Sequence, residues 1–232
     1  MQPHERLILA LDLPQHDAIL ALAKRTVGHV GMVKVGLEAY VRYGNALLEV
    51  LAELGHSIFL DLKLHDIPRT VAAVVKGIDA RHIRLLTVHA SGGPEMIRAA
   101  RDAAPDTLDI IAVTMLTSMD DSTAKAAGFL GGIDATVRAL GDMAISSGAD
   151  GLVCASPDLP LLHHIGGKRV VPGIRLGHVD GDDQRRTATP VDAVRAGATW
   201  LVLGRPVLQS PDPVATLNSI AKNIADAETS SQ

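Results

Sequence analysis

Short apolar segments alternate with longer amphipathic segments along the whole chain. The short segments are rich in Val, Ile and Leu and have the length of buried strands, whereas the longer ones repeat apolar residues at helical spacing. We expect strands at residues 6–12, 31–36, 57–63, 85–89, 108–114, 151–154, 170–172 and 200–204. We expect helices at residues 15–27, 38–54, 68–80, 94–104, 134–147, 160–165, 190–196 and 213–227. Several of these helices begin with Pro or end near Gly, as helices commonly do.

Eight strands alternating with eight helices in 232 residues predict an α/β fold, a compact (β/α)8 TIM barrel. A doubly wound open sheet is the alternative. The length fits one barrel-sized domain better than two small ones, and no linker rich in Pro, Gly or Ser divides residues 1–232. The polar residues 226–232 are typical of a frayed tail. Residues 117–132 form a long segment after the fifth strand, in which we expect a short helix and a lid-like loop.

Composition narrows the classes of function. Aromatic residues make up 2% of the chain and its net charge is −4, so it has neither the stacking residues nor the basic field of a nucleic-acid-binding protein. The only cysteine, Cys154, excludes an internal disulfide and a cysteine-rich metal site. The apolar run at residues 7–11 is interrupted by Asp12 before it reaches the length of a signal-peptide core, and no segment is long enough to span a membrane. We therefore expect a cytoplasmic protein.

Charged residues interrupt the third expected strand. Asp61 and Lys63 are two positions apart, so a regular strand would place both side chains on one face, and Asp66 follows just beyond the strand end. Removing such a pair from water costs several kcal/mol per ion unless the charges satisfy each other. One interpretation is a structural ion pair; the other is a catalytic lysine held between carboxylates.

Other polar residues occur where strands run into their following loops, which is where TIM barrels carry their chemistry. Taken singly, Asp12 could cap the first helix and Lys34 could be a surface lysine, but a barrel would bring both to the same mouth as the charged third strand. For His89 we favour a structural hydrogen-bonding role over a catalytic one. The residues at these positions are Asp12, Lys34, Asp61, Lys63, His89, Thr117, Arg175, Gly204 and Arg205.

The end of the chain supplies a candidate phosphate site. Loops after the seventh and eighth strands of TIM barrels commonly bind phosphate through backbone N–H groups and guanidinium groups. Here these positions carry Pro172-Gly-Ile-Arg175 and Gly204-Arg205. We expect Arg205 to bind a phosphate, and one of Arg185 and Arg186 to lie on a solvated loop face.

Together these motifs resemble orotidine 5′-phosphate decarboxylases of the bacterial type. The resemblance rests on Asp61-x-Lys63-x-x-Asp66, with Asp12 and Lys34 before it and the phosphate motifs behind, and it runs from the first strand to the last. It implies a (β/α)8 barrel that forms a homodimer with active sites at the interface. The implied reaction converts orotidine 5′-phosphate to UMP and CO2, the last step of de novo UMP synthesis, without a cofactor or metal.

The resemblance also implies a role for each matching residue. Lys63 would donate a proton to C6, within an alternating series of charges formed by Lys34, Asp61, Lys63 and Asp66. Asp66, Ile67 and Thr70 match positions that the neighbouring subunit contributes. The remaining matches would bind substrate: Asp12 and Lys34 the ribose hydroxyls, Thr117 the pyrimidine, and Gln184 with Arg205 the phosphate, with Arg175 and the Gly204 amide alongside.

Two alternatives remain open. Keto-gulonate-phosphate decarboxylases and hexulose-phosphate synthases share Asp-x-Lys-x-x-Asp but use Mg²⁺ and an enediolate; Lys34 and Gln184 argue against this alternative. The other alternative is a non-catalytic barrel that binds a phosphorylated metabolite.

Overall fold

The computed structural model describes residues 1–176 and 186–229, and in them eight parallel strands close into a barrel. Consecutive strands pair in sequence order, and β8 pairs with β1 to complete the closure. The strands are β1 (Leu7–Ala10), β2 (Met32–Gly36), β3 (Ile58–Leu64), β4 (Ile83–His89), β5 (Asp109–Val113), β6 (Gly151–Val153), β7 (Lys168–Val171) and β8 (Trp200–Leu203). The predicted (β/α)8 barrel is confirmed.

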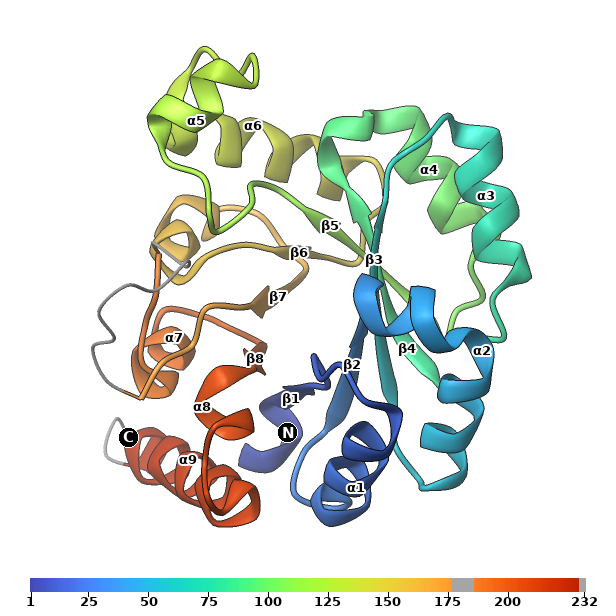
Figure 1. The fold of residues 1–232 in the computed structure, drawn as a ribbon. Helices are drawn as coiled ribbons and strands as arrows, with labels where there is room; N and C mark the ends of the chain where they lie inside the picture. Colours follow the sequence, from blue (N-terminus) through green and yellow to red (C-terminus); the bar gives the residue numbers. More distant parts are fainter. Residues whose placement is uncertain (177–185, 230–232) are drawn as a thin grey trace.

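Helices surround the strands as an outer ring (Figure 1). The α-helices are α1 (His16–Thr26), α2 (Leu37–Glu53), α3 (Pro68–Gly77), α4 (Pro94–Ala103), α5 (Asp121–Ala126), α6 (Gly132–Ser146), α7 (Pro190–Arg195), α8 (Arg205–Leu208) and α9 (Pro213–Thr229). Short 3₁₀ helices are η1 (Pro3–Arg6), η2 (Ala90–Gly92) and η3 (Ser156–Leu162).

Side chains of the strands alternate between two buried layers, as the period of a strand requires. On β1, Ile8 and Ala10 belong to the small cluster inside the barrel, whereas Leu7 and Leu9 belong to the large cluster between strands and helices. The inner cluster has Phe59 as its largest side chain, and the outer layer is built mainly from Leu, Ile, Val and Ala. A core with few aromatic residues is therefore divided between the barrel interior and the helix layer.

Two helices that we expected after β5 and β6 differ in how closely they follow the prediction. The short helix expected within residues 117–132 is α5, which begins after Asp120, whose carboxylate accepts a hydrogen bond from the Thr123 N–H at 2.8 Å. The helix expected at residues 160–165 is instead the 3₁₀ helix η3, which begins at Ser156. Pro160 lies inside it, and because proline has no N–H to donate, it disfavours a regular α-helix there.

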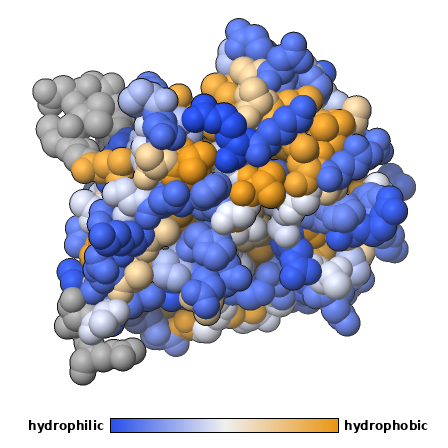
Figure 2. All heavy atoms as spheres, turned by 90° about the horizontal axis from the view of Figure 1, so that it is seen from below, coloured by the Kyte–Doolittle hydropathy of each residue, from blue (hydrophilic) through white to orange (hydrophobic). Residues whose placement is uncertain are grey.

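The two ends of the described chain lie close together. Helix α9 packs against η1, and the Arg6 guanidinium donates to the Glu228 carboxylate at 2.9 Å. We placed residues 226–232 in a frayed tail. Residues 226–229 are instead the last turn of α9, and residues 230–232 lie outside the described part of the chain. Hydrophilic side chains cover most of the face seen in Figure 2, with smaller apolar areas between them. No helix in the described residues is long and apolar enough to cross a bilayer.

Candidate active site

A cavity of about 510 Å³ opens at the carboxyl ends of the strands. Its wall contains residues from strands on all sides of the barrel, because parallel strands bring their carboxyl ends to one mouth. The predicted site residues that line it are Asp12, Lys34, Asp61, Lys63, Thr117, Arg175, Gly204 and Arg205. Predicted residues from the ends of six different strands thus share one cavity, whereas His89 at the end of β4 does not line it.

Charges of alternating sign lie side by side on one wall of the cavity. The Lys34 Nζ lies 2.9 Å from Asp12 Oδ1 and 3.7 Å from Asp61 Oδ2. The Lys63 Nζ donates to both carboxylate oxygens of Asp61 at 2.8 Å. The Lys34 and Asp61 side chains are only 10% and 12% exposed, so these charges depend on each other more than on water. We call Asp12, Lys34, Asp61 and Lys63 the charge array.

The array keeps Asp61 ionised despite its burial. Burial by itself raises the pKa of Asp61, but the charges of Lys34 and Lys63, with hydrogen bonds from Lys63 and Thr87, together lower its pKa below the ordinary value of 3.8. At neutral pH the carboxylate is therefore a fixed anion between two ammonium groups.

Strand β3 is irregular where it carries the array. Leu60 pairs with Leu86 and Leu64 pairs with Val88, so residues 61–63 bulge opposite Thr87 alone. Lys63 has φ 51°, which among the described residues makes it the one non-glycine residue in the left-handed region. This conformation is uncommon for a residue with a side chain, and such outliers concentrate at functional sites.

Gly36, on the same strand as Lys34, lies against the paired Lys34 and Asp12 side chains, which a larger residue would displace. A Cβ atom added at Gly36 would lie 2.9 Å from the Lys34 Nζ and 3.1 Å from Asp12 Oδ1. The φ of Gly36 is −83°, so close packing rather than backbone conformation favours glycine here. The sequence analysis did not single out Gly36, because only the three-dimensional approach of the lysine reveals this constraint.

The two histidines near the array lie against each other. The ring centroids of His65 and His89 are 5.4 Å apart. Burial lowers the pKa of His89, and the nearby His65 and Lys63 lower it further. The structural role that we favoured for His89 stays a prediction.

The expected phosphate residues line the cavity at the ends of β7 and β8. Arg175 is buried, its backbone N–H donates to the Ala188 carbonyl at 2.9 Å, and one guanidinium nitrogen donates to the Ile174 carbonyl at 2.9 Å. Arg205 is the first residue of α8 and follows Gly204 at the end of β8. Gln184 and Arg185 lie outside the described residues.

Arg186 has a different environment from the solvated loop face that we considered for it. Its guanidinium pairs with Asp158, whose side chain is 2% exposed, and a second nitrogen donates to the Leu116 carbonyl at 3.3 Å. Asp158 also accepts the Ala155 N–H at 3.0 Å. This buried pair links the segments after β5, β6 and β7, and the sequence analysis missed Asp158 altogether.

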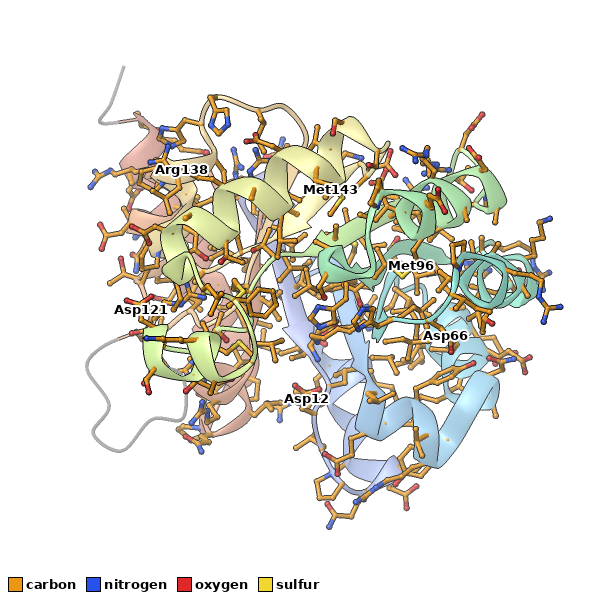
Figure 3. The ribbon with its side chains drawn as sticks, turned by 90° about the horizontal axis from the view of Figure 1, so that it is seen from above. Asp12, Asp66, Met96, Asp121, Arg138 and Met143 are labelled. Carbon is orange, nitrogen blue, oxygen red and sulfur yellow. The ribbon has the colours of Figure 1, made fainter. Side chains whose placement is uncertain are left out.

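Asp66 does not join the array within its own chain. Among the described residues, Lys63 pairs with Asp61, and the Asp66 carboxylate accepts a hydrogen bond from the Ile67 N–H at 2.7 Å. Seen from above, Asp66 lies toward α2 and α3, apart from Asp12 (Figure 3). Ile67 is 61% exposed, and neither Ile67 nor Thr70 lines the cavity.

No three side chains of His, Cys, Asp or Glu in the described ranges gather closely enough to suggest a metal site.

Comparisons with known proteins agree with the fold and with the motifs. Residues 5–220 match the model of the orotidine 5′-phosphate decarboxylase / HUMPS family. An orotidine 5′-phosphate decarboxylase of Anaeromyxobacter sp. (strain K) is 42% identical over 97% of this chain and 100% of its own length. One from Novosphingobium aromaticivorans is 43% identical over 91% of this chain and 96% of its own length.

Solved structures give the same result. The crystal structure of orotidine 5′-phosphate decarboxylase from Lactobacillus acidophilus has a TM-score of 0.80 and 34% identity, covering 94% of this chain and 98% of that one. An uncharacterized conserved protein from Geobacillus kaustophilus has the same TM-score with 32% identity, covering 94% of this chain and 99% of that one. The family expected from the motifs is confirmed: the chain belongs to the orotidine 5′-phosphate decarboxylase / HUMPS family.

Proposed function

We propose that this protein is a carboxy-lyase that converts orotidine 5′-phosphate to UMP and CO2, the last step of de novo UMP synthesis, in the cytoplasm. The observation that carries the proposal is the charge array in the barrel mouth of a chain from this family. The same cavity is lined by two arginines, Arg175 after β7 and Arg205 after β8, which suit a substrate with a phosphate at one end.

The chemistry explains why such an array is useful. Loss of CO2 from C6 of the pyrimidine leaves an electron pair in an sp² orbital outside the ring π system, so a conjugated electron sink cannot delocalise it. A preorganised ammonium group stabilises charge that develops nearby, and it needs no reorganisation during the reaction. In the proposed mechanism Lys63 is that group, and it then donates its proton to C6.

Asp61 has two effects in this mechanism. It holds the Lys63 ammonium through both of its oxygens, and its negative charge disfavours the substrate carboxylate next to it. Lys34 is held in turn by Asp61 and Asp12. Because positive and negative side chains alternate in the charge array, its two ammonium groups and two carboxylates hold each other in place before substrate binds.

The remaining cavity residues would bind the parts of the substrate that do not react. We propose that Asp12 and Lys34 bind the ribose hydroxyls and that Thr117 binds the pyrimidine. Arg205 would bind the phosphate, together with Gln184, Arg175 and the Gly204 amide. Binding energy from a remote phosphate is useful in catalysis when it organises the reacting groups.

We further propose a homodimer in which Asp66, Ile67 and Thr70 complete the partner's site. The support is that Asp66 and Ile67 are exposed just beyond the carboxyl end of β3, at the rim where the cavity opens. On the neighbouring β2–α2 unit, Leu37 and Val41 are 58% and 75% exposed. Apolar side chains exposed near one rim of the barrel favour a protein interface there.

Subunit exchange tests the shared site. Lys63→Ala and Asp66→Ala homodimers should each be inactive. After exchange, one site of each heterodimer carries both lesions and the other carries neither, so activity should return to about half that of wild type if the sites are independent. If mass spectrometry confirms exchange and no activity returns, Asp66 acts within its own chain.

One ultraviolet absorbance assay separates the proposed function from its alternatives. Orotidine 5′-phosphate should be consumed at the same rate with and without EDTA. A rate that EDTA abolishes would favour the Mg²⁺-dependent members of the superfamily. UMP binding without turnover would favour a non-catalytic binding protein.

A further inference from the structure

The hydroxyl of Thr87 contacts the charge array from the neighbouring strand. Thr87 lies on β4 and is fully buried. Its Oγ1 donates to Asp61 Oδ1 at 2.9 Å and accepts the backbone N–H of Lys63 at 2.8 Å. A single hydroxyl therefore contacts both the carboxylate that holds the catalytic ammonium and the backbone of the residue that carries it.

These contacts replace those that a regular sheet would supply. Because residues 61–63 bulge opposite Thr87, the Lys63 N–H has no regular partner across the ladder, and a buried N–H without a partner is costly. The hydroxyl accepts this N–H and so stabilises the left-handed backbone of Lys63. Its remaining proton is then directed at Asp61.

We propose that Thr87 is a positioning residue, whose hydroxyl fixes the bulge of β3 and thereby aims the Asp61 carboxylate and the Lys63 ammonium at the substrate. This inference rests on the proposed function of the charge array. It adds a residue that does not line the cavity and has no expected contact with substrate. A shift of reacting groups by about 1 Å is enough to cost roughly 100-fold in rate, so a small relaxation of the bulge matters.

Thr87→Val tests the inference, since it keeps the branched shape and removes the hydroxyl. We expect kcat to fall by roughly 10- to 100-fold, while KM for orotidine 5′-phosphate and Kd for UMP change by less than about threefold. Thr87→Ser should recover most of the lost kcat. If Thr87→Val does not fold, Thr87→Ala replaces it, because Ala differs from the Ser variant by one oxygen atom.

Thr199 provides a matched control at the other end of the barrel. Its hydroxyl accepts the backbone N–H of Arg169 at 2.9 Å from the position just before the neighbouring strand β8, far from the array. Thr199→Val should retain kcat. An equal loss of kcat in Thr87→Val and Thr199→Val would overturn the inference. The loss would then follow from removing any hydroxyl that bonds to a strand backbone, wherever it lies in the barrel.

Lys63→Ala separates failure of this inference from failure of the proposed function. If Lys63→Ala is inactive but Thr87→Val has wild-type kcat, the positioning role of Thr87 is wrong and the array stands. A rise in KM with kcat unchanged would also overturn the positioning role. If Lys63→Ala remains active, the proposed role of the array fails, and the inference about Thr87 fails with it.

Discussion

Breaking the buried ion pair between Asp158 and Arg186 should strongly lower the stability of the fold. The Asp158 carboxylate is 2% exposed, and it accepts hydrogen bonds from the Arg186 guanidinium and from the Ala155 N–H. In Asp158→Ala, the buried guanidinium would keep the Leu116 carbonyl as a partner at 3.3 Å, and its Nε already has none among the described residues. The substitution therefore removes the carboxylate that pairs with a mostly buried guanidinium among the described residues.

The expected magnitude follows from that burial. Removing one partner of a buried ion pair costs about 3–5 kcal/mol. For a domain of this size, each kcal/mol lowers the melting temperature by about 2–4 °C, so Asp158→Ala should lower it by roughly 6–20 °C. Asp158→Asn should have a smaller effect, because its side-chain oxygen can still accept the Ala155 N–H.

Thermal denaturation followed by circular dichroism measures these shifts. Asp79→Ala is the matched control: Asp79 pairs with Arg81 on the surface, so its loss should leave the melting temperature unchanged. Asp158→Leu combined with Arg186→Met should recover stability relative to Asp158→Ala, since no charge then remains buried. A melting temperature for Asp158→Ala within about 2 °C of wild type would refute the reasoning.

Two further predictions concern the cavity. Arg205→Ala should raise KM for orotidine 5′-phosphate strongly, because the phosphate would lose its guanidinium partner, and an unchanged KM would remove Arg205 from the site. Asp61→Asn should lower stability at neutral pH, measured by urea denaturation, because two lysines lose a shared counterion. The folded-state pKa of Asp61 lies below its ordinary value of 3.8. The extra free energy of unfolding that Asp61 gives relative to Asn is therefore fully present above about pH 3.8, and it is lost as the pH falls through the folded-state pKa. The prediction would be contradicted if the difference in free energy of unfolding between wild type and Asp61→Asn were no smaller at about pH 3 than at about pH 7.

Much of the barrel could be predicted because its strands are nearly continuous apolar runs. Their ends agree with the structure within a few residues, and Asp12, Lys34, Asp61 and Lys63 lie where those runs meet polar residues. Rules of barrel topology then bring these strand ends to one mouth without any knowledge of side-chain contacts.

The residues that sequence analysis missed depend on contacts between distant segments. Thr87 reads as an ordinary buried strand residue, and its role follows only from the register shift between β3 and β4. Asp158 and Arg186 are far apart in sequence, and nothing local to either predicts their pairing. Whether Asp66 acts in the partner's site concerns a second chain, so it stays a prediction.

Lys63→Ala tests the central claim most directly. The structure places the Lys63 ammonium 2.8 Å from both oxygens of a buried Asp61, in the mouth of the barrel. The account predicts a loss of kcat of roughly 10⁴-fold or more, because both the proton and the stabilising charge disappear, while calorimetry still detects UMP binding. Lys24→Ala, which removes an exposed lysine on α1, should have wild-type kinetics. Near-normal turnover by folded Lys63→Ala would contradict the account.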